Sequence, residues 1–204
     1  MIEAHYHRRN LPHIYIPERS YFITFRLKGS LLMRKLYELR NILEAKHKAQ
    51  SKAEVYEVNK KFFAEYDKSL DTANKGPKFL YVDKITDIII GSFKYYDRKD
   101  YSLVCVCIMP NHVHVLFTLL EKSRSLDKIM QSVKRYSALQ INRQLNRSGT
   151  VWQPESYDHV IRDEDEYFNI IRYILDNPIK AGLIDNWFEW KGTFISDYLK
   201  EMLE

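Results

Sequence analysis

The sequence contains one hairpin signal that limits what the chain can fold into. The segment "YSLVCVCIM" (101–109) and the segment "HVHVLFTL" (112–119) are both rich in branched and apolar residues, which is typical of strands. Only Pro110-Asn111 lies between them, and a two-residue connection joins antiparallel neighbours. Two such apolar strands need other elements packed on them, so the hairpin predicts a layered domain built on a sheet.

The hairpin also predicts a register. If Met109 pairs with His112, then Cys107 lies opposite His114 and Cys105 lies opposite Leu116. We expect the opposite face, which carries Val104, Val106, Ile108, Val113, Val115 and Phe117, to be the face that helices cover. The two histidines are then expected on the other, more polar face of the sheet.

The remaining segments predict an α+β domain. Residues 20–27 and about 157–161 are expected to be strands, and residues 30–48, 82–100, 125–149 and 163–177 are expected to be helices. Asp163 and Glu166 resemble a capping box at the start of the last helix, and Pro178 is expected to end it. This order predicts a ferredoxin-like sandwich, with an antiparallel sheet, helices on one face and a helical insertion after the first strand.

Composition sets the outer bounds. The 204 residues suit a single domain (1–204) with a polar helical elaboration at about 45–78 and a mixed C-terminal tail at about 185–204. No apolar run reaches the length of a membrane span, and the two cysteines are too close on one strand for a normal disulfide. A cytoplasmic protein is therefore expected. The net charge of +5 is compatible with a polyanionic partner without establishing one.

Two histidines separated by one residue raise the possibility of a metal site. On one face of a strand, the rings of His112 and His114 can converge on a single ion. Two hydrogen-bonded structural histidines are an equally good interpretation of the spacing alone. A zinc site that includes Cys107 is a further alternative, although no second metal-binding motif completes it.

The helix predicted at 163–177 carries a second polar pair. Its apolar residues form one stripe, and at about 100° per residue Tyr173 lies roughly 160° from the middle of that stripe. Asn177, four residues later, shares the face of Tyr173. An exposed tyrosine and a helix-ending asparagine would give the same pattern.

Taken together, "MPNHVHVLF" and "YDHVIRDEDEYFNIIRYILDNPIKAGLI" resemble the single-tyrosine transposases of the HUH superfamily, named for histidine-hydrophobic-histidine. The resemblance is to the branch called REP-associated tyrosine transposases, and it extends from about Tyr6 to Trp190. It implies a ferredoxin-like catalytic domain that uses a divalent metal, Mg²⁺ or Mn²⁺. It also implies that single-stranded DNA is cleaved and rejoined beside a hairpin through a 5′-phosphotyrosine intermediate.

The resemblance assigns roles to individual residues. Tyr173 matches the nucleophile, His112 and His114 match the metal-binding pair, and Asn177 matches the third metal ligand. For DNA binding we expect basic and aromatic residues that follow the hairpin, namely Lys134, Arg135, Arg143, Arg147, Trp152 and Arg172. The alternative is that the basic residues are ordinary surface charges and that Trp152 belongs to the core. Tyr157 is a further stacking candidate, Tyr136 is expected to stack or pack, and His159 is expected either to orient a ligand or to serve the structure.

The expected partner is single-stranded or hairpin DNA with palindromic repeats, bound by a monomer or a homodimer without a membrane. Two other functions remain open. One is a non-catalytic protein that binds hairpin nucleic acid, which would need none of the four matched residues. The other is a rolling-circle replication initiator, which shares the histidine pair and the tyrosine chemistry.

Overall fold

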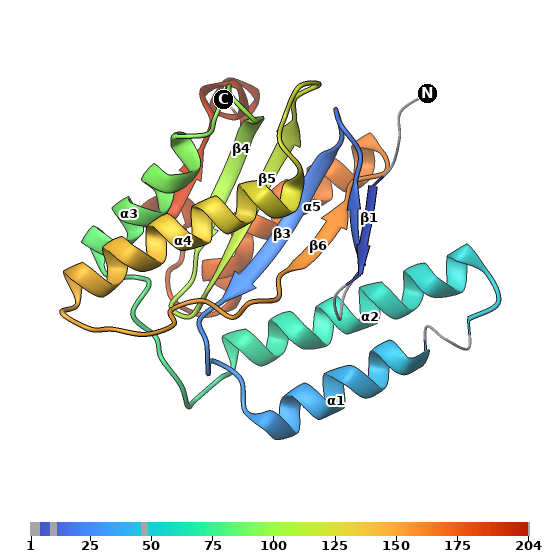
Figure 1. Ribbon diagram of the computed structural model, residues 1–204, viewed down its shortest axis with the longest axis horizontal. Coiled ribbons are helices and arrows are strands. Elements are labelled where there is room, and N and C mark those ends of the chain that lie inside the picture. Colours follow the sequence, from blue (N-terminus) through green and yellow to red (C-terminus); the bar gives the residue numbers. More distant parts are fainter. Residues whose placement is uncertain (1–4, 9–11, 46–48, 204) are drawn as a thin grey trace.

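The computed structural model describes residues 5–8, 12–45 and 49–203, and it is organised around a five-stranded antiparallel sheet (Figure 1). The strands are β3 (Ser20–Arg26), β4 (Tyr101–Ile108), β5 (His112–Leu119), β6 (Tyr157–Val160) and β7 (Thr193–Ile195). Their spatial order is β6-β3-β5-β4-β7. Without β7 this is the strand order of a ferredoxin-like fold, so the predicted fold class is confirmed.

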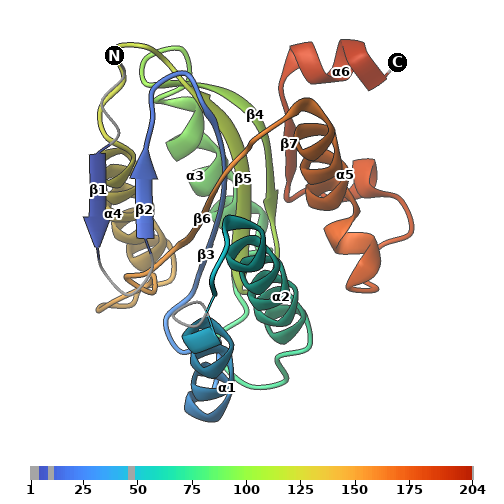
Figure 2. The same cartoon turned by 90° about the vertical axis from the view of Figure 1, so that its right-hand side faces the viewer.

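Helices cover both faces of this sheet, not one face as the sequence suggested (Figure 2). The first face packs against α3 (Asp83–Lys94) and α4 (Leu126–Gln144) and forms the larger apolar core. The second face packs against α5 (Glu164–Lys180), with α2 (Lys52–Asp71) beside it. The predicted polar face is therefore a second interior, because these two helices remove it from water.

The β4–β5 register matches the prediction near the turn. Cys107 pairs with His114 and Cys105 with Leu116, and the amide of Met109 donates to the carbonyl of His112 at 2.9 Å. A bulge between Leu103 and Cys105 then shifts the pairing. One extra residue turns Val104 to the second face, so its predicted place in the Val113 face is wrong.

The elaboration predicted at about 45–78 contains α2, which forms an antiparallel pair with α1 (Met33–Glu44) from the helix predicted at 30–48. The pair has a small apolar core of its own, made of Leu31, Leu39, Phe62, Tyr66 and Leu70. Its two ends meet, because a Cβ placed on Gly76 would lie 2.6 Å from the carbonyl oxygen of Gly29. The insertion therefore leaves the sheet and returns to it at one point.

The C-terminal part departs from the predictions in two places. Helix α5 continues through Pro178 to Lys180, because in its last turn the proline removes only one backbone donor. The tail adds β7 to the edge of the sheet, and in the sequence β7 lies between a 3₁₀ helix (Trp187–Glu189) and α6 (Asp197–Leu203).

Near the other terminus, β1 (His5–Arg8) and β2 (Pro12–Tyr15) form a separate two-stranded sheet. None of the helices in the described ranges has the length and apolar character that a membrane span requires.

The close approach of Gly76 to Gly29 gives the first prediction. Gly76 has φ +103 and contacts the Gly29 backbone, so Gly76→Ala should lower the free energy of unfolding by about 2 kcal/mol through backbone strain and steric overlap. Gly91 lies in α3 with open space at its Cβ position, so the control Gly91→Ala should stabilise by about 0.5–1 kcal/mol. Urea unfolding measures both values, and equal effects of the two changes would contradict the close approach.

Candidate active site

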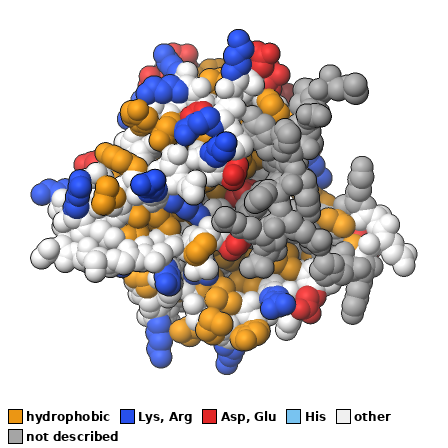
Figure 3. Space-filling model, in the orientation of Figure 1, with side chains coloured by type: hydrophobic (Ala, Val, Ile, Leu, Met, Phe, Trp, Pro, Cys, Tyr) orange, Lys and Arg blue, Asp and Glu red, His pale blue; other side chains and the backbone are white. Residues whose placement is uncertain are grey.

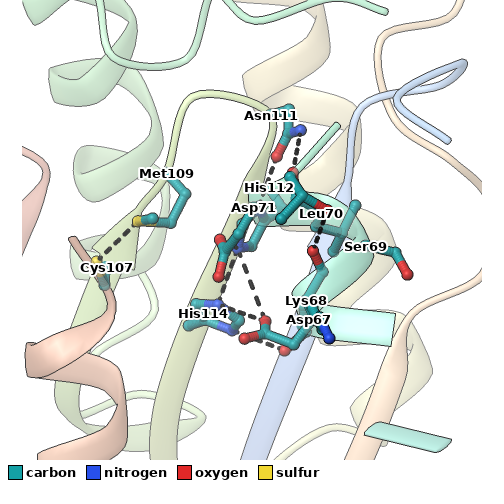
Figure 4. A network of polar contacts seen from close by, with 12 residues as sticks. Asp67, Lys68, Ser69, Leu70, Asp71, Cys107, Met109, Asn111, His112 and His114 are labelled. Atoms are coloured by element: carbon teal, nitrogen blue, oxygen red, sulfur yellow. Dashed lines mark hydrogen bonds and ion pairs between the residues drawn. The ribbon is translucent and has the colours of Figure 1, made fainter. Parts of the chain in front are cut away.

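Two imidazole rings form the centre of the candidate site on the second face of the sheet (Figure 4). His112 and His114 are both 0% exposed, and their Nε2 atoms lie 3.0 Å apart. The predicted convergence of the two rings is thus present in the structure. Their burial is not what the sequence suggested, and it arises because α2 and α5 cover this face.

Hydrogen bonds on the far side of each ring hold the two Nε2 atoms in place. The Nδ1 atom of His112 lies 2.6 Å from Oδ1 of Asn111, whose Nδ2 donates to the Leu70 carbonyl at 2.9 Å. Since Asn111 Oδ1 can only accept, His112 Nδ1 carries the proton. Burial lowers the pKa of His112 to about 3, so the ring is neutral and its Nε2 has a lone pair that can accept from His114 Nε2 or bind a cation. The Nδ1 atom of His114 is held by Thr24 Oγ1 at 2.8 Å.

Helix α2 brings two carboxylates to the imidazole pair. Oδ1 of Asp67 lies 3.3 Å from His114 Nε2 and 3.9 Å from His112 Nε2, and Oδ1 of Asp71 lies 3.9 Å from His112 Nε2. For Asp67, burial opposes ionisation, but the hydrogen bond to His114 and the neighbouring imidazoles outweigh it and lower its pKa to about 2. Burial, together with the charge of Asp67, raises the pKa of Asp71 to about 7.

These groups fit a divalent cation. Asp67, His112 and His114 offer ligand atoms that all lie within 4.8 Å of one another. Two nitrogens bound to one octahedral ion at about 2.1 Å each would lie about 3 Å apart, which is the separation of the two Nε2 atoms. Oδ1 of Asp67 and Oδ1 of Asp71 are buried without a hydrogen bond of good geometry among the described residues, and a cation would satisfy them. Cys107 is outside this group, and its sulfur contacts that of Met109.

Asp67 is the site residue that the sequence analysis missed. It lies 45 residues before His112, in a Lys- and Glu-rich segment that was interpreted as a polar elaboration. The available signal was two aspartates four residues apart, which places Asp67 and Asp71 on one face of a helix next to Phe63. That spacing alone does not distinguish a buried acidic face from a solvated one.

Tyr173 and Asn177 share a face of α5, as predicted, but that face is not turned to solvent. The Tyr173 ring packs edge-on against Phe22, Phe63 and His114, with its centroid 5.6 Å from that of His114. Asn177 is 1% exposed. The Tyr173 hydroxyl and Asn177 Oδ1 are both buried without a hydrogen bond of good geometry among the described residues.

The surroundings of Tyr173 disfavour its ionisation. Burial, followed by the charge of Asp67 beside the hydroxyl, raises the pKa of Tyr173 well above its ordinary value, although Asn177 acts in the opposite direction. A phenol in this state is a poor nucleophile until positive charge reaches it. The arrangement therefore pairs a tyrosine that needs activation with a group of atoms suited to a cation.

The site is closed to a DNA strand in this conformation. Both imidazoles and the Tyr173 hydroxyl are without exposed surface, and Phe63 of α2 contacts both Phe22 and Tyr173. Because Phe63 lies against the Tyr173 ring, a movement of α2 relative to α5 would uncover the hydroxyl. The hydrogen bond from Tyr56 to Glu166, which is 3.4 Å long, is among the contacts that join the two helices.

Two of the residues predicted to bind DNA have structural partners instead. Trp152 is 4% exposed, packs edge-on against Phe25 and donates from Nε1 to Ser137 Oγ at 2.9 Å. The expectation that Trp152 stacks on unpaired bases is therefore wrong, because its ring is part of the first core. Lys134 donates from Nζ to the carbonyls of Gln153 and Pro154 and to Ser156 Oγ, and so holds the loop before β6.

The other predicted basic residues are exposed but do not converge on the site. Arg135, Arg143 and Arg147 lie on or just after α4, where Figure 3 shows Lys and Arg side chains on the surface. Arg172 is exposed on α5, which lies across the sheet from α4. Tyr136 on α4 is half exposed, whereas His159 is bound to Glu166 at 3.0 Å.

Comparison with known proteins agrees with this geometry. Residues 83–177, which contain the histidine pair, Tyr173 and Asn177, match the family model described as "Transposase IS200 like". The chain is similar in sequence to REP-associated tyrosine transposases over part of its length. It is 29% identical over 103 residues to a putative REP-associated tyrosine transposase of Haemophilus influenzae, and 26% identical over 91 residues to a REP-associated tyrosine transposase of Escherichia coli K12.

These matches are partial in both directions. They cover 46% and 44% of this chain, and 58% and 52% of the two relatives. A solved structure, described as a REP-associated tyrosine transposase bound to a REP hairpin, matches 97% of this chain and 85% of its own. Its TM-score is 0.54 at 17% identity, so that likeness supports the fold. The sequence matches support the family resemblance.

The site geometry predicts a metal dependence for stability. Mn²⁺ should raise the melting temperature of the wild-type protein, because an ion that binds only the folded state stabilises it. Asp67→Asn removes one candidate carboxylate ligand and should weaken Mn²⁺ binding by about 10- to 100-fold or more, because replacing even the groups that only support metal ligands has effects of that size. His114→Ala should abolish the Mn²⁺ effect.

Asp87 is an exposed aspartate on α3, so Asp87→Asn is the matched control and should retain the full Mn²⁺ shift. Calorimetric titration would give the affinities directly. Unchanged Mn²⁺ affinity in the Asp67→Asn variant would exclude Asp67 as a ligand.

Proposed function

We propose that this chain is a metal-dependent tyrosine transposase, which cleaves and rejoins single-stranded DNA beside hairpins through a 5′-phosphotyrosine intermediate. The observation that supports this most is the placement of Tyr173, whose buried hydroxyl has no hydrogen bond of good geometry among the described residues and whose ring contacts His114. A tyrosine needed only for packing would be expected to satisfy its hydroxyl. We propose that residues 1–204 form one such domain, with a helical elaboration at about 45–78, which contains α2, and a C-terminal tail at about 185–204.

In this proposal His112 and His114 hold the divalent ion through Nε2, together with Asn177 and the Asp67 carboxylate. A bound Mg²⁺ or Mn²⁺ would polarise the scissile phosphate and neutralise the charge that develops on it. Asn111 and Thr24 keep the two rings oriented, so the cost of ordering them is met during folding. Only one of the proposed ligands is anionic, which leaves positive charge for the phosphate.

The reaction follows from the position of the phenol. The Tyr173 oxygen forms a bond to phosphorus while the bond from phosphorus to the 3′-oxygen breaks. The phenol loses its proton, and the leaving 3′-oxygen gains one to become a hydroxyl. The product is a phosphate diester of tyrosine, so a second 3′-hydroxyl can attack it and release Tyr173. That reversibility suits strand transfer.

We further propose hairpin DNA with palindromic repeats as the substrate. The E. coli relative is called a REP-associated tyrosine transposase, and the solved relative is described as bound to a REP hairpin. In this chain the exposed arginines Arg135, Arg143 and Arg147 offer a basic surface for the duplex phosphates. Because the site is closed, α2 must move away from α5 before the strand reaches Tyr173.

A hairpin-binding protein without catalysis is the main rival. It would have no use for a pair of buried imidazoles beside unsatisfied carboxylates and a tyrosine, since such groups destabilise the fold unless something binds them. A rolling-circle initiator would use the same groups, and it is distinguished by its substrate and its partners, not by this site.

The nucleophile gives the third prediction. Tyr173→Phe removes one oxygen that has no good hydrogen bond, so the variant should keep its fold and its Mn²⁺ binding. It should lose covalent joining to DNA entirely, because no other group in the same position replaces a tethered nucleophile. A labelled single-stranded oligonucleotide incubated with Mn²⁺ should stay with the wild-type protein through denaturing electrophoresis.

Tyr136, half exposed on α4, supplies the control for this experiment. Tyr136→Phe should form the adduct at the wild-type rate, and mass spectrometry should locate the adduct on the peptide that contains Tyr173. Undiminished adduct in the Tyr173→Phe variant would remove the proposed mechanism.

The basic surface of α4 gives the fourth prediction. Binding to a DNA hairpin should weaken steeply with salt, because bound cations are released from each phosphate that the protein neutralises. Replacing Arg135, Arg143 and Arg147 with alanine should make the slope of log affinity against log salt shallower, by about 1 for each phosphate that the variant no longer binds. Lys200→Ala, on α6, should leave the slope unchanged. If the arginine variant has the same salt slope as the wild-type protein, the DNA does not bind the surface of α4.

A further inference from the structure

A groove of about 740 Å³ opens on the side of α2 that faces away from Tyr173. Helices α1 and α2 form one wall, and the segment 153–157 before and within β6 forms the other. Its volume is within the roughly 300–1,000 Å³ of sites that hold small organic groups. The groove is outside the metal site, and no role proposed above uses it.

Aromatic rings line this groove. Phe62 stacks on Tyr66 with ring centroids 5.8 Å apart and on Tyr157 with centroids 6.0 Å apart. All three residues line the groove, together with Leu39 and Leu43 of α1. Flat, apolar walls of this kind suit a planar ring system, and every nucleobase has such a face.

A guanidinium group is buried at the same place. Arg26 is 4% exposed and donates from Nη1 to Ser30 Oγ and to the Leu27 carbonyl, at 3.2 and 3.4 Å. Tyr66 is its other neighbour, and no carboxylate among the described residues forms an ion pair with it. A buried arginine without an anionic partner is costly unless a ligand completes its hydrogen bonds.

The charges in the groove favour a base over a phosphate. Arg26 and Arg40 are balanced by Glu44 and Glu155, so the groove has little net charge to attract a phosphate. Glu155 has a buried Oε2 atom without a donor among the described residues. The groove is therefore lined by aromatic rings, a guanidinium group and a carboxylate that can accept hydrogen bonds. Guanine presents acceptors at O6 and N7, which pair with arginine, and N–H donors on its other edge.

We propose that this groove holds one unpaired base of the single-stranded part of the substrate, and that it prefers guanine. Arg26 would bind the acceptor edge, Glu155 would accept from the donor edge, and the base would lie among Phe62, Tyr66 and Tyr157. This inference rests on the proposed function for the identity of the polymer. Its chemistry uses none of the metal ligands.

The experiment measures DNA binding in EDTA, where no cleavage is expected. The wild-type protein should bind a short thymidine strand that carries two guanines more tightly than the all-thymidine strand, by about 10-fold, as expected for one well-held base. Leu43→Trp fills the groove from α1 and should remove that difference. Leu139→Trp, at a half-exposed position on α4, should retain it.

Glu155→Gln should reduce the preference for guanine while leaving affinity for the thymidine strand unchanged. Circular dichroism and thermal unfolding check that each variant is folded. Equal wild-type affinity for the two strands, or a guanine preference that survives Leu43→Trp, would overturn the proposal. The Tyr173 adduct is measured separately with Mn²⁺, so loss of one result without the other shows which of the two proposals has failed.

Discussion

The arrangement of the second sheet face depends on a polar cluster enclosed in an apolar layer. His112, His114 and Asp67 lie between Phe22, Phe63 and the strands, where unpaired polar groups are costly. Each ring has one satisfied nitrogen, held by Asn111 or Thr24, while the Nε2 atoms and the carboxylates face one another. A cation would satisfy the remaining atoms at once, so the same ion would serve both stability and chemistry.

The two faces of the sheet differ in composition and in what they contribute to the fold. The first face, against α3 and α4, is almost entirely apolar and accounts for most of the buried core. The second face alternates apolar residues with Thr24, Arg26 and the two histidines along adjacent strands. Because the first face can sustain the sheet, the second can carry groups that would otherwise destabilise a small domain.

What could be predicted from the sequence depended on local rules. The pairing of Cys107 with His114 followed from side-chain alternation and a two-residue turn, and the shared face of Tyr173 and Asn177 followed from helical spacing. Asp67 could not be found in this way, since its contact with His114 joins segments 47 residues apart. The prediction for Trp152 failed for a related reason. Its place in the core depends on contacts with Phe25 and Ser137, which the spacing of residues along the sequence does not reveal.

Helix α2 contributes residues both to the proposed base-binding groove and to the candidate active site. Phe62 and Tyr66 face the groove, whereas Phe63 and Asp67 face the tyrosine and the imidazoles. Successive residues of a helix point about 100° apart, so adjacent positions on one rigid element line two different sites. An occupant that shifts α2 from the groove side must also shift Phe63 and Asp67. If α2 moves away from α5 when DNA reaches Tyr173, a base in the groove would act on the same element that covers the tyrosine.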